Sequence, residues 1–209
     1  MNLAKQTIID FKRISPKDGD LFGGKDPVAT VKELEKKGVL GISVVTEQDN
    51  FGGSIDLLRQ IRAATRLPLL RKDFITSVDE ILITKECKAD AVLLILSTIN
   101  DFNLAGVLFE KALELKLHPL VEVHTAEEMK QAIKLKAKII GINNRDIANL
   151  ELDDGTVNTT KELIKQAPKD AFIISESGIR NNADAVCAIN YGANAVLVGT
   201  AFWKGKFVI

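Results

Sequence analysis

The chain has 209 residues, of which 46% are hydrophobic, and this fits one domain with a sizeable core. Its 28 basic and 28 acidic residues balance, so a general nucleic-acid-binding surface is not expected. No apolar run approaches the roughly 20 residues that a membrane helix needs, and the first residues lack the apolar core of a signal peptide, so we expect a cytoplasmic protein with no membrane contact.

Eight short apolar runs along the chain predict β-strands. They span residues 7–13, 40–46, 68–74, 90–96, 119–123, 138–145, 171–176 and 195–199. Helical spacing between the strands predicts helices over residues 27–38, after the turn at 51–54 to about 66, after 77, over 100–116, after 125, over 159–167, and up to 191. Expected helix caps are Asp26, Ser77 and Thr125, the last with Glu128 in a capping box. Residues 17–25 are polar and contain three glycines, which predicts a mobile loop.

The repeat of one strand and one helix every 20–30 residues or so predicts a (β/α)₈ barrel that fills residues 1–209 as a single domain. A doubly wound open sheet is the structural alternative. It usually has fewer strands and a glycine-rich first turn, which Asp10-Phe11-Lys12-Arg13 is not. Cys87 and Cys187 have no metal-ligand spacing and fall in predicted helices, so we expect reduced thiols with a packing role and no metal.

Six of the predicted strands carry polar or charged groups at or near their C-terminal ends. These are Asp10, Lys12, Glu47, Lys72, Glu122, Asn143, Arg145 and Glu176. Each would be an ordinary surface residue by itself, but the C-terminal ends of barrel strands face one mouth, where active sites lie. The barrel therefore predicts that all eight converge.

Two of these residues are the sharpest candidates. Lys72 lies in a segment whose apolar residues, 68–70, are followed directly by three charged ones, 71–73. Partial burial lowers the pKa of a lysine towards the range useful for acid catalysis. The alternative is that the three charges lie on a solvated loop. Glu122 lies between Val121 and Val123, so its carboxylate must be paired or solvated by a cleft. An ion pair with Lys12 or Lys72 would satisfy it and is compatible with catalysis.

The last two strands are each followed by small residues. Ser177-Gly178 follows the seventh strand and Gly199-Thr200 follows the eighth. Such turns offer free backbone N–H groups, and barrel enzymes often bind phosphate at these two loops. We therefore expect a phosphate site there.

Motifs that carry a family resemblance run from the first strand to the last. They are IDFKRISP (9–16), VTE (45–47), FGGS (51–54), LRKDFI (70–75), LVEVH (120–124), GINNRD (141–146), SESGI (175–179) and AVLVG (195–199). Together they resemble the indole-3-glycerol phosphate synthase family of the tryptophan pathway. The motifs with lysine, glutamate and arginine are specific, whereas the glycine-rich ends are shared by many phosphate-binding barrels.

The resemblance implies a lyase that closes an indole ring on 1-(2-carboxyphenylamino)-1-deoxyribulose 5-phosphate and releases carbon dioxide and water, with no metal or organic cofactor. It implies Lys72 as the general acid, and Glu122 as the carboxylate for ring closure or dehydration. The resemblance also implies that Lys12, Ser15 and Arg145 bind the anionic groups of the substrate, that Asn143 and Glu176 position its sugar hydroxyls, and that Glu47 contacts it. Asp10 is implied as a partner of a catalytic lysine. Phe74 and Leu197 would enclose the anthranilate ring, and the phosphate would bind at Ser177, Gly178, Gly199 and Thr200.

The sequence departs from the family at three places. The family usually has glutamate at the position of Asp10. It also carries a segment before the first strand that packs over the mouth, whereas about six residues precede that strand here, so we expect that lid to be absent.

The partner expected is a phosphorylated small molecule; tryptophan-pathway enzymes or weak self-association remain open.

The third departure is the end of the chain, because residues 201–209 are too short for a usual eighth helix. They hold five large apolar side chains: Phe202, Trp203, Phe207, Val208 and Ile209. Since every barrel strand needs its outer face covered, we expect them to fold back over the last strand and the first helix.

Two other functions are compatible with the residues. A sugar-phosphate isomerase of related barrel type would use Asp10 and Glu122 as its pair of carboxylates, but it leaves Lys72 and Arg145 unexplained. A phosphate-metabolite-binding barrel with weakened catalysis is the other alternative.

Overall fold

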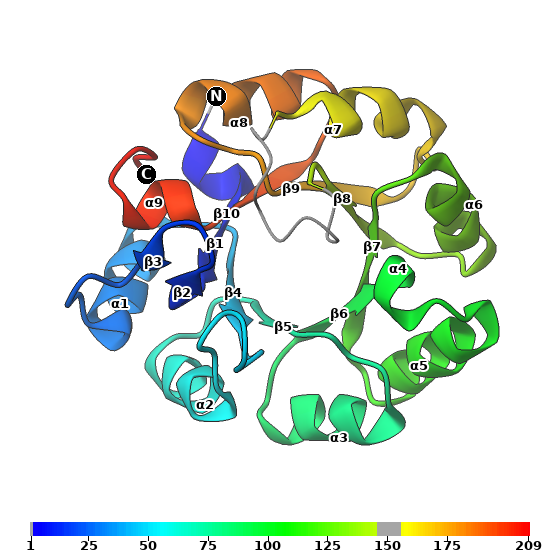
Figure 1. The fold of residues 1–209 in the computed structure, drawn as a ribbon, viewed down its shortest axis with the longest axis horizontal. Coiled ribbons are helices and arrows are strands. Elements are labelled where there is room, and N and C mark those ends of the chain that lie inside the picture. The colour runs from blue at the N-terminus through cyan, green and yellow to red at the C-terminus, as the bar shows by residue number, and fades with distance from the viewer. Residues whose placement is uncertain (1, 146–155) are drawn as a thin grey trace.

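Eight parallel strands close into a barrel in the computed structural model, which describes residues 2–145 and 156–209 (Figure 1). In barrel order β1 pairs with β4 on one side and with β10 on the other, which closes the sheet. The strands are β1 (Thr7–Phe11), β4 (Gly41–Val45), β5 (Leu69–Lys72), β6 (Ala91–Ile95), β7 (His118–Val123), β8 (Ile139–Asn143), β9 (Phe172–Glu176) and β10 (Ala195–Val198). This closure confirms the predicted (β/α)₈ barrel and rules out the open sheet.

A ring of helices covers the outside of the barrel (Figure 1). They are α1 (Pro27–Lys37), α2 (Ile55–Ala64), α3 (Val78–Glu86), α5 (Phe102–Glu114), α6 (Ala126–Lys134), α7 (Asn158–Leu163) continued by the 3₁₀ turn η3 (Ile164–Gln166), α8 (Asn182–Asn190) and the short α9 (Thr200–Trp203). The expected caps are confirmed: Asp26 accepts from the Val28 N–H, and Ser77 and Thr125 each form a full capping box. Of the helices described, none is long and apolar enough to cross a membrane.

Three local predictions are wrong. The fourth strand ends at Ile95, and the residues after it form a short helix, α4 (Leu96–Ile99), so the next helix begins at Phe102 behind the cap Asp101 instead of at residue 100. The segment 17–25 is not a loop throughout, because two of its residues form β3 (Gly19–Asp20), which pairs with β2 (Ile14–Ser15). The Cys187 side chain is exposed, so it has no packing role, whereas Cys87 is buried as expected; both are free thiols.

The barrel has two apolar layers, because successive side chains of a strand point to opposite faces. Inward side chains fill its centre: Leu70, Leu93, Ile95, Leu120, Ile174, Ala195 and Leu197. Outward side chains such as Ile9, Phe11 and Val44 pack beneath the helices. A polar residue that takes an inward position near the C-terminal end of a strand therefore lies above the apolar centre, at the mouth.

The C-terminal segment packs where the sequence predicts. Trp203 and Phe207 are buried in the cluster that also holds residues of β1, β10 and α1. The Trp203 ring lies 5.1 Å from that of Phe11, and its indole Nε1 donates to the backbone oxygen of Asp10 at 2.8 Å. Val208 is the exception, since 66% of it is exposed, so the expectation that all five apolar residues cover the barrel is wrong for this one.

Candidate active site

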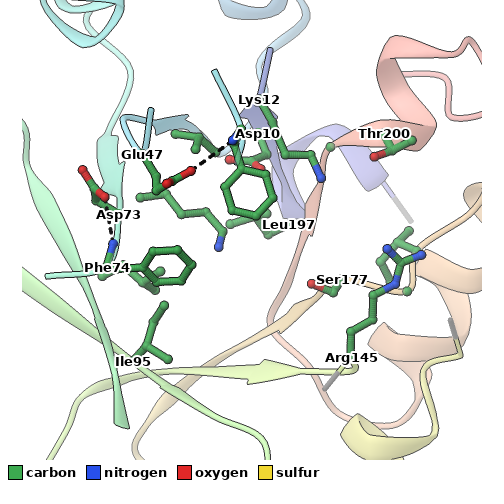
Figure 2. A pocket seen from close by; sticks show the side chains of 17 residues that line it. Asp10, Lys12, Glu47, Asp73, Phe74, Ile95, Arg145, Ser177, Leu197 and Thr200 are labelled. Atoms are coloured by element: carbon green, nitrogen blue, oxygen red, sulfur yellow. Dashed lines mark hydrogen bonds between the residues drawn. The ribbon is translucent and has the colours of Figure 1, made fainter. Parts of the chain in front are cut away.

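The mouth of the barrel holds a cavity with an aromatic side and a polar side (Figure 2). Eleven of the fifteen predicted site residues line it. Its lining includes Asp10, Lys12, Glu47, Phe51, Lys72, Phe74, Ile95, Arg145, Ser177, Gly178, Leu197, Gly199 and Thr200. Figure 2 shows Phe74 and Ile95 on one side, with Arg145 and Ser177 facing them across the cavity. This confirms that the strand ends converge, as the barrel predicts.

A lysine and a carboxylate face each other at the floor of this cavity. Lys72 Nζ lies 3.9 Å from Glu122 Oε2, and the side chains are 24% and 1% exposed. The ammonium therefore reaches the cavity while the carboxylate lies below its surface. Of the two ion pairs that the sequence allows for Glu122, the structure forms the one with Lys72.

Asn143 fixes the orientation of that carboxylate. Its Nδ2 donates to Glu122 Oε1 at 3.0 Å, and its own Oδ1 accepts from the Arg145 N–H at 2.9 Å. The His124 ring also contacts the Asn143 backbone oxygen, at 2.8 Å from Nδ1. Because Oε1 of Glu122 is held on the amide, its other oxygen is turned to the lysine.

A second carboxyl group, that of Glu176, is buried beside Glu122. Burial raises its pKa well above the ordinary value, and the negative charge of Glu122 raises it further, while Lys72 acts in the opposite direction. Among the described residues, neither Glu176 oxygen has a hydrogen-bond partner if both carboxyl groups are ionised. A protonated Glu176 can donate to Glu122, so the pair can hold one proton between them.

Gly141 makes room for this arrangement. A Cβ atom at that position would lie 1.9 Å from Glu176 Oε1. The residue was predicted only as part of a strand, and an inward glycine in an otherwise apolar strand was the available sign of a close neighbour.

Lys12 and Phe51 extend the aromatic side of the cavity next to Phe74. The Lys12 ammonium lies 5.5 Å from the centre of the Phe51 ring, and that ring is 6.4 Å from Phe74. Phe51 was not predicted as a site residue. Glu47 holds it in place, because its carboxylate accepts backbone N–H groups across the turn, including that of Phe51 at 3.0 Å.

The predicted phosphate loops line the other end of the cavity. Ser177 and Gly178 are consecutive left-handed residues, with φ of 59° and 68°. A side chain at 178 would approach the Thr156 backbone oxygen to 2.7 Å, so glycine is needed there. The Asn144 side-chain amide holds the turn by donating to the backbone oxygens of Glu176 and Ser177.

One predicted substrate contact lies apart from the cavity lining. Ser15 is buried in the β2–β3 hairpin, where its Oγ accepts from the Asp18 N–H at 3.3 Å. Residue 146, the last of the GINNRD motif, lies outside the described residues. Asn143, Glu122 and Glu176 lie beneath the cavity surface, where they support its floor.

Comparison with known proteins gives a consistent result. The family model described as "Indole-3-glycerol phosphate synthase" matches residues 2–207. Proteins of that name from Pyrococcus furiosus and Thermococcus kodakarensis are 46% and 44% identical, over 95% and 94% of this chain and 86% of each relative. The protein of that name from Aquifex aeolicus is 41% identical over 95% of this chain and 76% of its own.

A solved structure shares the fold alone. The N-acetylmannosamine-6-phosphate 2-epimerase from Clostridium perfringens superposes with a TM-score of 0.75 at 14% identity, covering 95% of this chain and 88% of the other. At this identity the likeness extends to the barrel and carries no information on chemistry.

Proposed function

The chain belongs to the indole-3-glycerol phosphate synthase family, and from this premise we propose that it is a carboxy-lyase that closes the indole ring on 1-(2-carboxyphenylamino)-1-deoxyribulose 5-phosphate. A carbon–carbon bond forms between the aromatic carbon that bears the carboxylate and the carbonyl carbon of the sugar. The carboxylate then leaves as carbon dioxide, and loss of the new hydroxyl group with a ring proton, as water, gives the aromatic indole.

The observation that carries this proposal is the pair of Lys72 and Glu122 at the floor of the cavity. Ring closure places negative charge on the sugar carbonyl oxygen, so a proton donor must lie close to it. Lys72 is that donor in our proposal. The later loss of water needs a proton for the departing hydroxyl and a base for a ring proton, and Glu122 serves this second step.

The rest of the cavity supports the same substrate. Phe74 and Leu197 enclose the flat anthranilate ring, and we assign the Phe51 ring to the same wall. Lys12 and Arg145 receive the carboxylate before it leaves, while Asn143 and Glu176 position the sugar hydroxyls. The turns at Ser177-Gly178 and Gly199-Thr200 receive the phosphate.

The sugar-phosphate isomerase alternative is not favoured by the relatives found. Its two carboxylates, Asp10 and Glu122, are both at the mouth, but that function assigns no role to Lys72 or Arg145.

A turnover assay tests the proposal. The purified chain is mixed with the anilino-ribulose phosphate, and indole formation is followed by fluorescence. Lys72→Met should lower kcat by ~10²–10⁴-fold, the usual loss for a positioned acid, while substrate binding survives. Lys138→Met is the matched control, because Lys138 pairs with Asp170 at the opposite end of the barrel. Isomerisation of a ribose phosphate in a separate assay with no indole formed, binding of the anilino-ribulose phosphate without turnover, or a Lys72→Met variant within a few-fold of the parent would contradict the assignment.

A further inference from the structure

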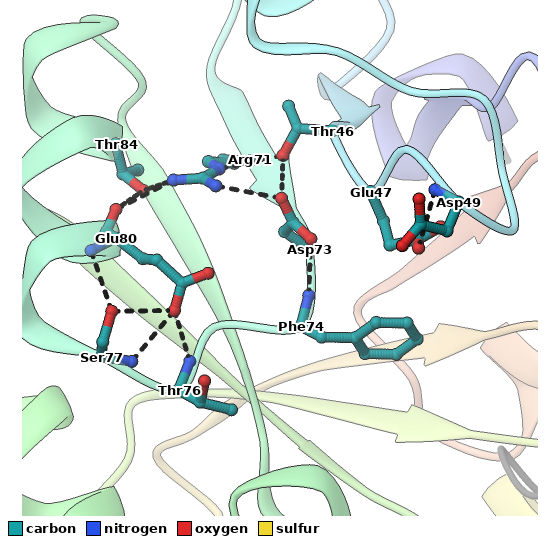
Figure 3. Close-up of polar contacts among 10 residues, drawn as sticks. All are labelled: Thr46, Glu47, Asp49, Arg71, Asp73, Phe74, Thr76, Ser77, Glu80 and Thr84. Carbon is teal, nitrogen blue, oxygen red and sulfur yellow. Dashed lines mark hydrogen bonds and ion pairs between the residues drawn. The ribbon is translucent and has the colours of Figure 1, made fainter.

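Arg71 and Lys72 are neighbours on β5 but point to opposite sides of the sheet. Lys72 faces the cavity, whereas the Arg71 side chain lies outside the barrel beneath α3 and is 5% exposed. Figure 3 shows how its guanidinium is held. It donates from Nε to Thr46 Oγ1 at 2.9 Å, from Nη1 to the Glu80 backbone oxygen at 2.9 Å and Thr84 Oγ1 at 3.1 Å, and from Nη2 to Asp73 Oδ2 at 3.0 Å.

The Asp73 carboxylate connects this guanidinium to the turn after β5. One oxygen accepts from both Arg71 and the Thr46 hydroxyl, and the other accepts from the Phe74 N–H at 2.9 Å. The Thr46 N–H in turn donates to the Lys72 backbone oxygen at 2.9 Å. The residues on either side of Lys72 are therefore fixed from outside the barrel, and so is the backbone of Phe74.

The Thr46 hydroxyl also links two loops that meet at the cavity. Thr46 follows the last residue of β4 and precedes Glu47, whose carboxylate accepts from the Phe51 N–H. Asp73 lies on the other loop and holds Phe74. The two rings that these loops carry lie 6.4 Å apart on the aromatic side of the cavity. A change in the contact between Thr46 and Asp73 would therefore alter the spacing of the rings.

A buried ion pair of this kind is weak evidence for stability, because the cost of removing both charges from water offsets much of their attraction. The Arg71–Asp73 ion pair is better explained by its effect on the position of neighbouring groups, Lys72 and Phe74. Catalytic groups need support from neighbours that lock their position, since small displacements are costly to the rate.

We propose that Thr46, Arg71 and Asp73 are positioning residues, which hold Lys72 and Phe74 in the geometry that the reaction needs. The proposal rests on the proposed function for its kinetic test. It adds three residues to those that determine the rate, and of these Asp73 also lines the cavity.

Thr46→Val tests the network by removing one hydroxyl at nearly constant volume. We expect kcat to fall by about 10- to 100-fold, with a smaller rise in KM, because the acid is displaced and the Phe74 ring shifts while the phosphate loops are unchanged. Thr46→Ser restores the hydroxyl and should recover kcat. Asp73→Asn, which keeps the size of the side chain, should show the same loss of kcat and serves if Thr46→Val does not fold.

Thr84→Val is the matched control. It removes a buried hydroxyl from the same guanidinium but leaves the links to Thr46 and Asp73 intact. It should lower Tm about as much as Thr46→Val and keep kcat within about 2-fold of the parent. Parental kcat in Thr46→Val, or equal losses of kcat in the two valine variants, would overturn the proposal.

A second readout separates this inference from the proposed function. Lysines are methylated with ¹³C, and the Lys72 signal is assigned by its loss in Lys72→Arg. The signal should shift in Thr46→Val and stay in place in Thr84→Val, whether or not the parent forms indole. If the parent forms no indole but the Lys72 signal shifts as expected, the proposed function fails and the network stands. An unchanged Lys72 signal in Thr46→Val overturns the network itself.

Discussion

Replacement of Gly141 by alanine is expected to damage the site far more than the fold. Gly141 faces the interior of the barrel, next to the Glu176 carboxyl group. A Cβ at this position would lie 1.9 Å from Glu176 Oε1, 2.9 Å from its Cδ and 3.4 Å from Leu120 Cδ1. The added methyl group therefore clashes with the Glu176 carboxyl, whereas its contact with Leu120 in the apolar centre is close to an ordinary van der Waals distance.

The size of the effect follows from these distances. Real Cβ contacts stay beyond 3.0 Å, so the carboxyl oxygen must retreat by about 1 Å. A misplacement of ~1 Å in a catalytic site can lower the rate by about 10²-fold. Overpacking a buried position costs about 1–3 kcal/mol, which corresponds to a fall in Tm of about 2–12 °C for a chain of this length. The variant should thus remain folded with a kcat near 1% of the parent.

Thermal melting and turnover measured on the same preparations test this reasoning. Glu176→Asp supplies the control, because its side chain is shorter by one methylene and leaves space for the alanine methyl. The double variant should melt higher than additive effects of the two substitutions predict, which is the signature of direct contact. A Gly141→Ala variant with parental Tm and kcat, or strict additivity in the double variant, would refute the close approach of Gly141 to Glu176.

Two further predictions concern pH and the C-terminal segment. The pKa of Glu176 is raised above its ordinary value of 4.5 in the fold, so stability should fall as the pH rises from there towards the raised value. Glu176→Gln should flatten this slope in melting curves between pH 4 and 8, and parallel curves would count against it. Trp203→Ala should lose about 3–5 kcal/mol, or about 6–20 °C in Tm, since the ring is buried against Phe11. The exposed Val208→Ala is its control, and equal melting of both would show that the Trp203 ring contributes nothing.

The sequence was sufficient to predict the barrel and the approximate position of its site. Each apolar run ends in polar groups, and parallel strands of a barrel bring those ends together, so residues as distant as Asp10 and Arg145 could be placed at one cavity. Glu122 could be predicted as paired because a carboxylate between two valines needs a partner. The choice between Lys12 and Lys72 as that partner depends on strand neighbours across the barrel, which a single sequence does not state.

The close neighbours of individual residues were harder to predict. Gly141 had the same appearance as any strand glycine until the Glu176 carboxyl was placed beside it. Ser15 belonged to a matching motif, yet the hairpin of β2 and β3 turns it to the Asp18 backbone. In both cases the outcome depends on contacts between segments far apart in the chain or on a local pairing with no periodic signal.

The three charged residues at the end of β5 show that the side of the sheet to which a side chain points decides its role more than its charge does. Arg71, Lys72 and Asp73 in sequence are compatible with a solvated loop. In the fold, Lys72 faces inward to the cavity, while Arg71 lies on the outer side beneath α3 and pairs with Asp73, which follows β5 at the edge of the cavity. Since inner and outer positions on one strand share a backbone, a brace on the outer face restrains a catalytic group on the inner face. The same short run can therefore supply both the acid and its support.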